Sequence, residues 1–393
     1  MSHSPSHSHD VFCTILPPHM LKHMATVGDK EICDLAHRSI EAAAAARGQR
    51  AILGPMAAAF AVSPGEKRRT VYDGKNGQQL PGKLARGEED AKVKDVTVNE
   101  AFDGAGATYD FFRTVYNRNS VDGNGMRLDS TVHYGRDFDN AFWNGMQMVY
   151  GDGDGRIFNR FTKSLDIIGH ELTHGVVQFS AGLIYQDQSG ALNEHFADVF
   201  GSLVKQFQKK QTADKADWLI GQGLLAAGVK GVALRSLKTP GSAYNDPLLG
   251  RDPQPAHIKN FLKTEDDNGG VHINSGIPNK AFHTLATILG GFAWERAGRI
   301  WYETLTRKLT NSATFQQCAD ATYEAAGALF GVGKAEQLAV RQAWQAVGMD
   351  VTKGLVVVSG PKLTVKADAA AAAASPAAAV APKPKPRAKR AAR

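Results

Sequence analysis

Two histidines stand four residues apart in the segment Gly169-His170-Glu171-Leu172-Thr173-His174. On a helix this spacing places both imidazoles on one face, one turn apart, where they can bind the same metal ion. Glu171 lies on an adjoining part of the helix surface. Neutral imidazoles are good zinc ligands, but a catalytic zinc site normally needs a third protein ligand and an open position for water. The segment therefore predicts part of a catalytic zinc site.

A second segment supplies the missing carboxylate. Glu194 follows His174 by 20 residues, and Asp198 lies one helical turn further on. Glu194 can be the third metal ligand, while Asp198 can accept the outward N–H of a ligand histidine and fix its tautomer. The alternative is a solvated acidic helix face. This alternative is weak, because buried carboxylates need partners and the helix carries a largely apolar set of residues, Ala191, Leu192, Phe196, Val199, Phe200 and Leu203.

These residues need helices to position them, and helical periodicity dominates from Ser164 onward. Candidate helices lie near 164–180, 190–209, 275–289, 292–308, 312–328 and 334–347. Between Thr70 and about Tyr150, short segments rich in Val, Tyr and Phe are separated by Gly, Asn and Asp, which predicts strands and turns around a helix near 97–118. The expected fold class is α+β, with a β-rich amino-terminal part and a mainly helical carboxy-terminal part.

The two ends of the chain differ from its body. Residues 20–47 show helical spacing and are followed by a loose linker rich in Gly, Pro and Ala. Beyond Thr352 the chain passes into an Ala-, Pro- and Lys-rich tail that lacks the apolar side chains needed to fold. We therefore expect a leader and linker over 1–65, catalytic subdomains over 66–180 and 181–350, and a basic tail over 351–393.

The composition excludes several classes of protein. The 393 residues are 43% hydrophobic and 22% charged, which is typical of soluble globular proteins. No apolar run reaches the roughly 18 to 20 residues needed to span a bilayer. The first twenty residues lack the pattern of a signal peptide, so we expect a cytoplasmic precursor or export by a leaderless route. Cys13, Cys33 and Cys318 are too scattered for a disulfide framework and are expected to be free thiols.

The net charge of +7 comes from the tail. Residues 353–393 hold nine Lys or Arg against one Asp, so the remaining residues carry 37 basic and 38 acidic groups. The body is thus close to neutral. We interpret the tail as a solvated arm; binding to nucleic acid or another polyanion is its functional alternative.

Beyond the metal-binding pattern, the chain resembles the thermolysin-like zinc endopeptidases, the M4 family, over about residues 70–350. The motifs that carry the resemblance occur in family order and are Asn140-Ala141-Phe142-Trp143-Asn144-Gly145, Tyr150-Gly151-Asp152-Gly153-Asp154-Gly155, the segment His170–His174, Gly182-Leu183-Ile184-Tyr185-Gln186, Ser189-Gly190-Ala191-Leu192-Asn193-Glu194, Leu234-Arg235-Ser236, and Asp267-Asn268-Gly269-Gly270-Val271-His272-Ile273-Asn274-Ser275-Gly276. The resemblance implies an active site in the cleft between the two subdomains.

The resemblance also implies roles for individual residues. His170, His174 and Glu194 would hold one zinc ion. Glu171 would be the general base toward water, while His272 and Tyr185 would stabilise the negative charge that develops on the substrate carbonyl oxygen. Asp267 would orient His272.

Substrate binding follows from the same resemblance. Asn140 and Ala141 match the edge segment that pairs with an extended substrate, and Arg235 matches an arginine that binds a substrate carbonyl. The residues that would line the pocket for the side chain after the cut bond are Phe158, Phe161, Ile167 and Leu234. Such a pocket implies cleavage of proteins and peptides on the amino side of bulky hydrophobic residues.

The chain departs from the family at its calcium positions. Asp166 and Asp217 match residues that bind a pair of calcium ions, but Lys205, Leu219 and Gln222 occupy the other positions. Calcium needs about 6 to 8 oxygen ligands and a lysine ammonium supplies none. We therefore expect no double calcium site, with Lys205 pairing with Asp166 instead, and we interpret Asp152-Gly153-Asp154 as a turn.

The leader around Leu16-Pro17-Pro18-His19-Met20-Leu21 resembles the short propeptide of the protealysin-like branch. It implies a zymogen in which the leader inhibits the enzyme intramolecularly and is removed by self-cleavage between about Ala45 and Glu66. We expect this zymogen to be a monomer. A Cys13 thiolate on zinc and weak metal binding by His3, His7 and His9 are minor alternatives. Two other functions stay open at this point: an inactive metal- or partner-binding module, and a nucleic-acid-associated protein that uses its tail.

Overall fold

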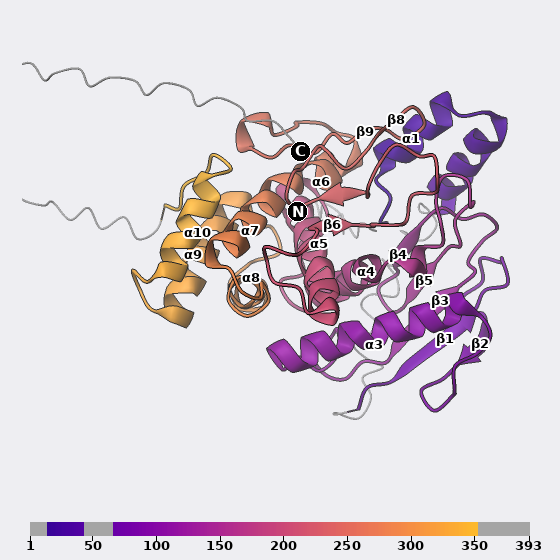
Figure 1. Ribbon diagram of the computed structural model, residues 1–393, viewed down its shortest axis with the longest axis horizontal. Coiled ribbons are helices and arrows are strands. Elements are labelled where there is room, and N and C mark those ends of the chain that lie inside the picture. Colours follow the sequence, from indigo (N-terminus) through magenta and orange to yellow (C-terminus); the bar gives the residue numbers. More distant parts are fainter. Residues whose placement is uncertain (1–13, 43–65, 353–393) are drawn as a thin grey trace, which may run out of the picture. The chain divides into compact units, whose positions relative to one another are not determined.

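The computed structural model describes residues 14–42 and 66–352, and these form an α+β fold, as predicted. A β-containing part comes first along the chain after the leader, and a helical part follows it. Figure 1 shows helices α4 and α5 between the sheet and the group of helices α7 to α10. The residues that would hold a metal lie on these two central helices.

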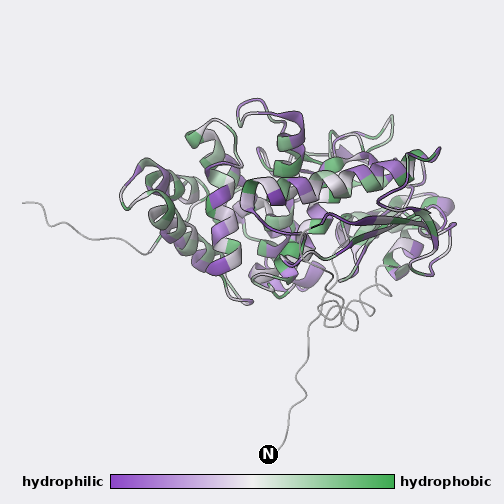
Figure 2. Ribbon diagram, turned by 90° about the horizontal axis from the view of Figure 1, so that it is seen from below, coloured by the Kyte–Doolittle hydropathy of each residue, from purple (hydrophilic) through white to green (hydrophobic). Residues whose placement is uncertain are grey.

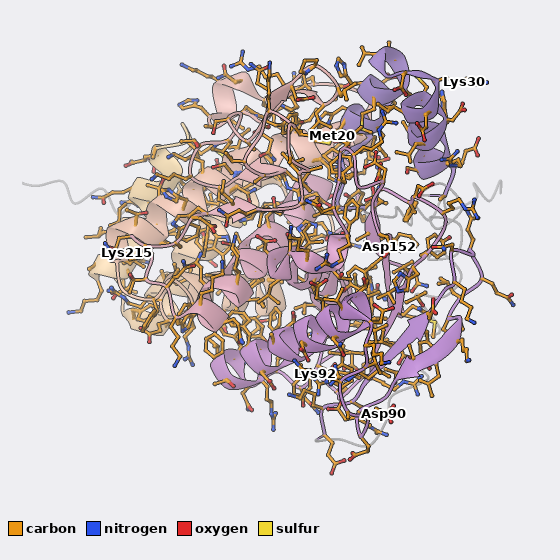
Figure 3. All side chains as sticks on the ribbon, turned by 45° about the vertical axis from the view of Figure 1, so that its right-hand side comes forward. Met20, Lys30, Asp90, Lys92, Asp152 and Lys215 are labelled. Carbon is orange, nitrogen blue, oxygen red and sulfur yellow. The ribbon has the colours of Figure 1, made fainter. Side chains whose placement is uncertain are left out.

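The leader consists of two helices instead of one continuous helical stretch. Helix α1 spans Pro18–Val27, and residues 30–42 form the second helix. The chain breaks at Gly28 because Asp29 starts the second helix, accepting a hydrogen bond from the backbone N–H of Ile32 at 3.0 Å. In Figure 3 the exposed Lys30 lies on the outer side of the leader, whereas Met20 is fully buried. The leader is thus packed on the rest of the chain. The predicted residues 43–47 lie outside the described part.

A five-stranded mixed sheet forms the core of the β-containing part. Its strands run in the order β2-β1-β3-β5-β4, so that β2 and β4 are the edges. The pairs β1–β3 and β3–β5 are parallel, and the two outer pairs are antiparallel. The strands are β1 (Arg69–Asp73), β2 (Lys83–Arg86), β3 (Leu128–Val132), β4 (Ala141–Trp143) and β5 (Met148–Tyr150). An edge strand presents unpaired backbone groups to which an extended chain can add, and β4 is the edge that faces the site described below.

Helix α3 (Val96–Tyr116) covers the sheet by packing against β1 and β3. Its buried residues Val98, Ala101, Phe102 and Ala105 recur at helical spacing. Asp95 caps its first turn by accepting hydrogen bonds from the N–H groups of residues 97 and 98. This helix confirms the one predicted near 97–118.

Helices α4 (Leu165–Gln178) and α5 (Asp187–Lys209) pack at unusually close range. Gly201 of α5 makes this possible, since a Cβ there would lie 2.5 Å from the carbonyl oxygen of Asp166 and 2.8 Å from the backbone nitrogen of His170. Gly169 of α4 faces it: a Cβ there would lie 3.1 Å from the Cα of Gly201. Two facing glycines therefore let the backbone of α5 approach the metal-binding turn of α4.

The carboxy-terminal part is mainly helical, as predicted. Its helices are α6 (Asp267–Asn274), α7 (Gly276–Leu289), α8 (Ala297–Arg307), α9 (Phe315–Phe330) and α10 (Ala335–Gln345). Two small sheets and two 3₁₀ helices complete the described elements: β6 (Leu219–Ile220), β7 (Arg235–Ser236), β8 (Asn245–Asp246), β9 (Gly250–Arg251), η2 (Phe161–Lys163) and η3 (Ile258–Asn260). The two-residue strands were not predicted, because they are too short to show a period of two.

The helices are amphipathic and pack around a large apolar cluster. Coloured by hydropathy, they carry both apolar and polar residues along their length (Figure 2). Trp301 of α8 and Trp344 of α10 stack in the core with ring centroids 6.3 Å apart.

No helix within residues 14–42 and 66–352 is long and apolar enough to cross a membrane. Cys33 and Cys318 are free thiols, as expected, and Cys13 lies outside the described residues.

One histidine ties three elements of the amino-terminal part together. His133 follows β3, and its Nε2 lies 2.8 Å from the Asp95 carboxylate that caps α3. Its Nδ1 lies 2.7 Å from the carboxylate of Asp152, which follows β5. The hydrogen bond with Asp152, helped by Asp95, outweighs partial burial and raises the pKa of His133 to about 9.

This bridge predicts a pH-dependent stability. A raised pKa in the folded state contributes stability that is fully present below the unfolded pKa of about 6.5 and is lost as the pH rises through about 9. Because the groups are partly exposed, we expect a loss of about 1 to 2 kcal/mol over that range. The His133→Asn variant, which tolerates the left-handed backbone at this position, should lack this part of the pH dependence. Urea unfolding between pH 6 and pH 10 measures it, and parallel curves for both proteins would contradict it.

Candidate active site

Two neighbouring helices bring three potential metal ligands together. His170 and His174 of α4 place their Nε2 atoms 3.0 Å apart. Glu194 of α5 places its Oε2 3.6 Å from His170 Nε2 and its Oε1 3.6 Å from His174 Nε2. All three residues are fully buried, and they form the one such group found within the described ranges, with ligand atoms within 4.8 Å of one another. Two imidazole nitrogens and a carboxylate oxygen are a donor set that fits zinc.

The outer nitrogens of the two histidines are held by acceptors. His170 Nδ1 lies 2.8 Å from Asp198 Oδ1, and His174 Nδ1 lies 2.9 Å from Asn193 Oδ1. Because both partners are acceptors, each Nδ1 carries the proton and each Nε2 keeps its lone pair for a metal. The donor set is therefore oriented in the form that a metal requires, which supports the fit to zinc.

The Glu194 carboxylate is surrounded by positive or potentially positive groups. Burial alone would raise its pKa, but His272, His174 and His170 outweigh this effect and lower the pKa to about 2. Glu194 is thus an anion at neutral pH, as a metal ligand should be.

Glu171 lies beside the same group and points toward the edge strand. Its Oε2 accepts a hydrogen bond from the backbone N–H of Trp143 in β4 at 3.1 Å. The side chain is fully buried. A carboxylate held between the metal ligands and an edge strand can take a proton from water that attacks a chain bound along that strand.

His272 and Tyr185 form a pair of donors on the other side. The Tyr185 hydroxyl donates to Glu194 and lies 3.1 Å from His272 Nε2. His272 Nδ1 lies 2.6 Å from Asp267 Oδ1, and Asp267 Oδ2 accepts the backbone N–H of His272 at 3.0 Å. Burial would lower the pKa of His272, but the Asp267 and Glu194 carboxylates outweigh it and raise the pKa to about 9. A protonated ring can donate from Nε2 while Nδ1 stays with Asp267.

An unusual turn places Asp267 and His272 in this relation. The four residues from Asp267 to Gly270 all have positive φ, between 52° and 85°, so that they form a short left-handed turn before α6 continues. Left-handed backbone is costly for most residues, but Asn and Gly adopt it readily. A Cβ at Gly269 would also clash with Asp187 at the start of α5. The Asn-Gly-Gly sequence is therefore required by the turn and by its contact with α5.

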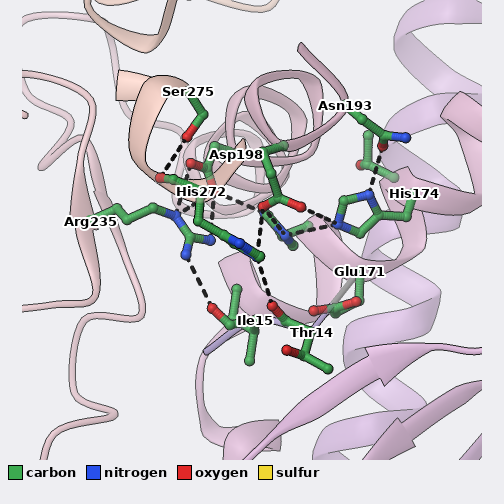
Figure 4. A network of polar contacts seen from close by, with 12 residues as sticks. Thr14, Ile15, Glu171, His174, Asn193, Asp198, Arg235, His272 and Ser275 are labelled. Carbon is green, nitrogen blue, oxygen red and sulfur yellow. Dashed lines mark hydrogen bonds and ion pairs between the residues drawn. The ribbon is translucent and has the colours of Figure 1, made fainter. Parts of the chain in front are cut away.

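The predicted substrate-binding residues contact the leader. The carbonyl oxygen of Ala141 accepts the N–H of Ile15 at 3.1 Å, and Asn140 Oδ1 accepts the N–H of Leu16 at 3.0 Å. Arg235 donates from Nη1 to the carbonyl oxygen of Ile15 at 3.1 Å (Figure 4). All three of these residues thus bind the leader backbone in this structure.

The four predicted pocket residues are at most 1% exposed and belong to the same apolar cluster as Ile15 and Leu16. They are Phe158, Phe161, Ile167 and Leu234. Their role in side-chain selection remains a prediction.

Several supporting residues were not predicted. Asn193 orients His174, and Gln254 donates to the carbonyl oxygen of His272 at 2.8 Å. Asn279 donates to Asp198 Oδ2 at 2.9 Å and contacts His195, which in turn accepts from Trp301 at 2.6 Å. One feature of the sequence pointed to Asn193, namely its position directly before the predicted metal ligand Glu194. The others are distant in sequence from the residues that they support and left no local pattern.

A buried two-histidine, one-glutamate group with a second glutamate beside an edge strand is the arrangement of a metallopeptidase, and the protein is a metalloendopeptidase. Residues 58–178 match the family model of the thermolysin metallopeptidase catalytic domain, and residues 181–349 match that of its alpha-helical domain. The chain belongs to the thermolysin family, which confirms the resemblance.

Its relatives include bacterial proteases. The extracellular metalloprotease of Pectobacterium carotovorum subsp. carotovorum is 54% identical over 288 residues, which cover 73% of this chain and 82% of that relative. Protease PrtS of Photorhabdus sp. (strain Az29) is 54% identical over 286 residues, covering 72% and 76% of the two chains. The solved structure of the precursor of protealysin, a metalloproteinase from Serratia proteamaculans, is 50% identical with a TM-score of 0.78 and covers 86% of this chain and 99% of that one.

Proposed function

We propose that this chain is a zinc-dependent neutral endopeptidase that hydrolyses proteins on the amino side of bulky hydrophobic residues and is made as a self-processing zymogen. One observation carries the proposal: the metal-binding group, Glu171 and the His272–Tyr185 pair converge on one buried site, and the backbone of the leader crosses it.

Each side chain then has a distinct task. His170, His174 and Glu194 would hold zinc, which when bound supplies Lewis acidity and makes water reactive near neutral pH. Glu171 takes a proton from the attacking water and passes it to the leaving nitrogen. His272 and Tyr185 donate hydrogen bonds to the oxygen on which negative charge develops. Asp267 and Asp198 keep His272 and His170 in the orientation that these tasks need.

The preference for hydrophobic residues rests on the buried apolar set Phe158, Phe161, Ile167 and Leu234. Ile15, the leader residue whose backbone is bound by Ala141 and Arg235, is apolar and fully buried. Burial of such a side chain in an apolar pocket makes the free energy of binding more favourable, whereas burial of a charged side chain makes it less favourable. A substrate bound like the leader would therefore be cut before a bulky apolar residue.

The leader over residues 1–65 acts as an intramolecular inhibitor in this proposal. Its described part crosses the site and is held by further contacts: His19 Nε2 lies 3.0 Å from the Tyr244 hydroxyl, Lys22 pairs with Asp266, and Glu31 pairs with Arg156. The similarity to a protealysin precursor supports a zymogen. The proposed cut between Ala45 and Glu66 falls almost entirely outside the described residues. We retain the division into subdomains at 66–180 and 181–350 and a tail over 351–393.

Chelation tests the function. Purified mature protein should contain one zinc ion per chain by elemental analysis and hydrolyse casein. Treatment with o-phenanthroline should abolish hydrolysis, and added zinc should restore it, because no described side chain replaces the lost Lewis acidity. A folded chain that lacks zinc, or hydrolysis that survives removal of the metal, would contradict the proposal and favour an inactive binding module.

We also propose that the double calcium site is absent. Lys205 Nζ lies 2.7 Å from Asp166 Oδ2, 2.8 Å from Asp217 Oδ1 and 2.7 Å from the carbonyl oxygen of Leu219. Its ammonium group thus contacts both carboxylates that match calcium positions. Asp154 Oδ1 accepts three backbone N–H groups, from residues 156, 157 and 158, as expected for a turn.

Millimolar calcium should accordingly leave the melting temperature unchanged, and EGTA should not lower it. The Lys205→Met variant should lose about 3 to 5 kcal/mol of stability, because two buried or half-buried carboxylates lose their cation. A melting temperature that rises by many degrees with calcium in the wild-type chain would show that a calcium site exists.

A further inference from the structure

The leader backbone lies across the metal-binding group in a defined direction and register. Ile15 donates its N–H to Ala141 of β4 and its carbonyl oxygen accepts from Arg235, while the next N–H, of Leu16, goes to Asn140. These three contacts involve successive backbone groups, so that a shift of the leader by one residue would break all of them. Ile15 and Leu16 are fully buried. The position of the preceding peptide bond is therefore fixed.

That preceding group is the carbonyl of Thr14. Its oxygen lies 3.1 Å from His272 Nε2, the donor assigned above to the developing oxyanion. In Figure 4 the side chains of Glu171 and His272 both point toward Thr14. The carbonyl that contacts the oxyanion donor belongs to Thr14, and the nitrogen that leaves on cleavage would belong to Ile15.

We propose that the Thr14–Ile15 peptide bond is a cleavage site of the chain's own active site, separate from the cut in the linker. This inference rests on the proposed function. Water adds to the Thr14 carbonyl carbon, and the bond from that carbon to the Ile15 nitrogen breaks. Glu171 takes a proton from the water and delivers it to the departing nitrogen. One water molecule is consumed, and the products end in a Thr14 carboxylate and an Ile15 amino group.

The contacts of the leader predict what happens after the cut. Residues 1–14 would leave, but residues from Ile15 onward keep their bonds to Ala141, Asn140 and Arg235 as well as the more distant anchors of α1 and the second leader helix. The newly formed end therefore stays bound at the active site as a product. Removal of residues 1–14 and release of the inhibitory leader are then two events, and the second needs the cut in the linker.

Mass spectrometry of the zinc-loaded full chain tests this order. The expected result is a fragment of residues 1–14 and a chain that begins at Ile15, seen before or together with the linker cut. Neither product should form with the Glu171→Gln variant or after chelation. Hydrolysis of casein by the same preparation reports the proposed function independently. If casein is hydrolysed and only the linker is cut, this inference is overturned while the function stands.

Two leader variants test the register. Ile15→Glu should slow cleavage at this bond by about 100-fold, because it places a charge in an apolar pocket. Val27→Glu is the matched control, since Val27 is the last residue of α1 on the same leader and is 47% exposed, and it should leave the cut unchanged. Equal rates in both variants would overturn the assignment.

A peptide removes any dependence on how the leader folds. A synthetic peptide of residues 10–20, with Cys13→Ser to avoid thiol chemistry, is incubated with mature enzyme. A cut between Thr14 and Ile15 supports the inference. A cut at any other bond, or none while casein is hydrolysed, overturns it.

Discussion

Replacing Glu171 with glutamine should lower kcat for peptide hydrolysis by about 10³- to 10⁴-fold, the upper range for a general base. Glutamine has nearly the same shape and keeps an oxygen that can accept the N–H of Trp143, so the side chain should stay in place. What it loses is the ability to take a proton from water. Because Glu171 is not among the three ligands, the variant should still bind one zinc ion per chain.

The comparison needs mature protein of both forms, since a variant without activity cannot remove its own leader. The Glu171→Gln chain is therefore processed by a trace of wild-type enzyme that is then removed. Glu89→Gln provides a control with the same chemical change at an exposed position and should keep full activity. Zinc content of the variant by elemental analysis decides the interpretation. Loss of zinc would mean that Glu171 supports the metal, and near-normal kcat would exclude it as the base.

The sequence predicted the parts of this site that depend on local geometry. His170 and His174 were predicted because residues four apart lie on the same face of a helix. Glu194 was predicted because it lies near the start of a second segment with helical periodicity and mostly apolar side chains. Nothing local indicates how closely the two helices approach. That distance depends on Gly169 facing Gly201, a contact between residues 32 positions apart that only the folded chain brings together.

The support around the site was harder to predict for the same reason. Asn279 reaches Asp198 across 81 positions, and Trp143 reaches Glu171 across 28. Amides are common at surfaces and in turns, so an isolated Asn or Gln carries little information about a buried partner. The break of the leader at Gly28 and the left-handed turn at Asp267 were also missed, since both depend on backbone angles that helical periodicity does not reveal.

The register of the leader is the clearest case of a long-range feature. Its residues Ile15 and Leu16 contact Ala141, Asn140 and Arg235, which are 124 to 220 positions away. The sequence predicted a leader and, separately, a set of substrate-binding residues. Only the structure shows that the leader contacts these residues. Its backbone thereby occupies the positions predicted for the backbone of a substrate.

Changing Asp198 to asparagine should have the second large effect, on both stability and metal binding. Asp198 is fully buried and accepts bonds from His170 at 2.8 Å, from Arg235 at 2.9 Å and from Asn279 at 2.9 Å. Despite burial, Arg235 and His170 hold the pKa of Asp198 well below its usual range, so the group is charged. Asparagine removes that charge and turns an NH₂ group toward partners that are themselves donors.

Breaking a buried ion pair on one side leaves the other charge uncompensated, which costs about 3 to 5 kcal/mol. Here the stranded charge is Arg235, which is 1% exposed. Asparagine has one accepting oxygen where Asp198 has two, and the loss of the negative charge beside His170 Nδ1 should in addition weaken zinc binding by about 10- to 100-fold. Asp246→Asn is a suitable control, because Asp246 is also buried but accepts backbone N–H groups and has no cation among those partners.

Urea unfolding and zinc competition with a chelator measure the two effects separately, and their combination distinguishes two roles for Asp198. If the residue only compensates Arg235, the double variant Asp198→Asn with Arg235→Met should recover both stability and zinc affinity. If it also positions His170, as the 2.8 Å contact indicates, the second change should recover stability alone. Zinc affinity that stays at the wild-type level in Asp198→Asn would contradict the positioning role. Among the described contacts of His170 Nδ1, only the one with Asp198 keeps the proton on Nδ1 and away from the metal-binding Nε2.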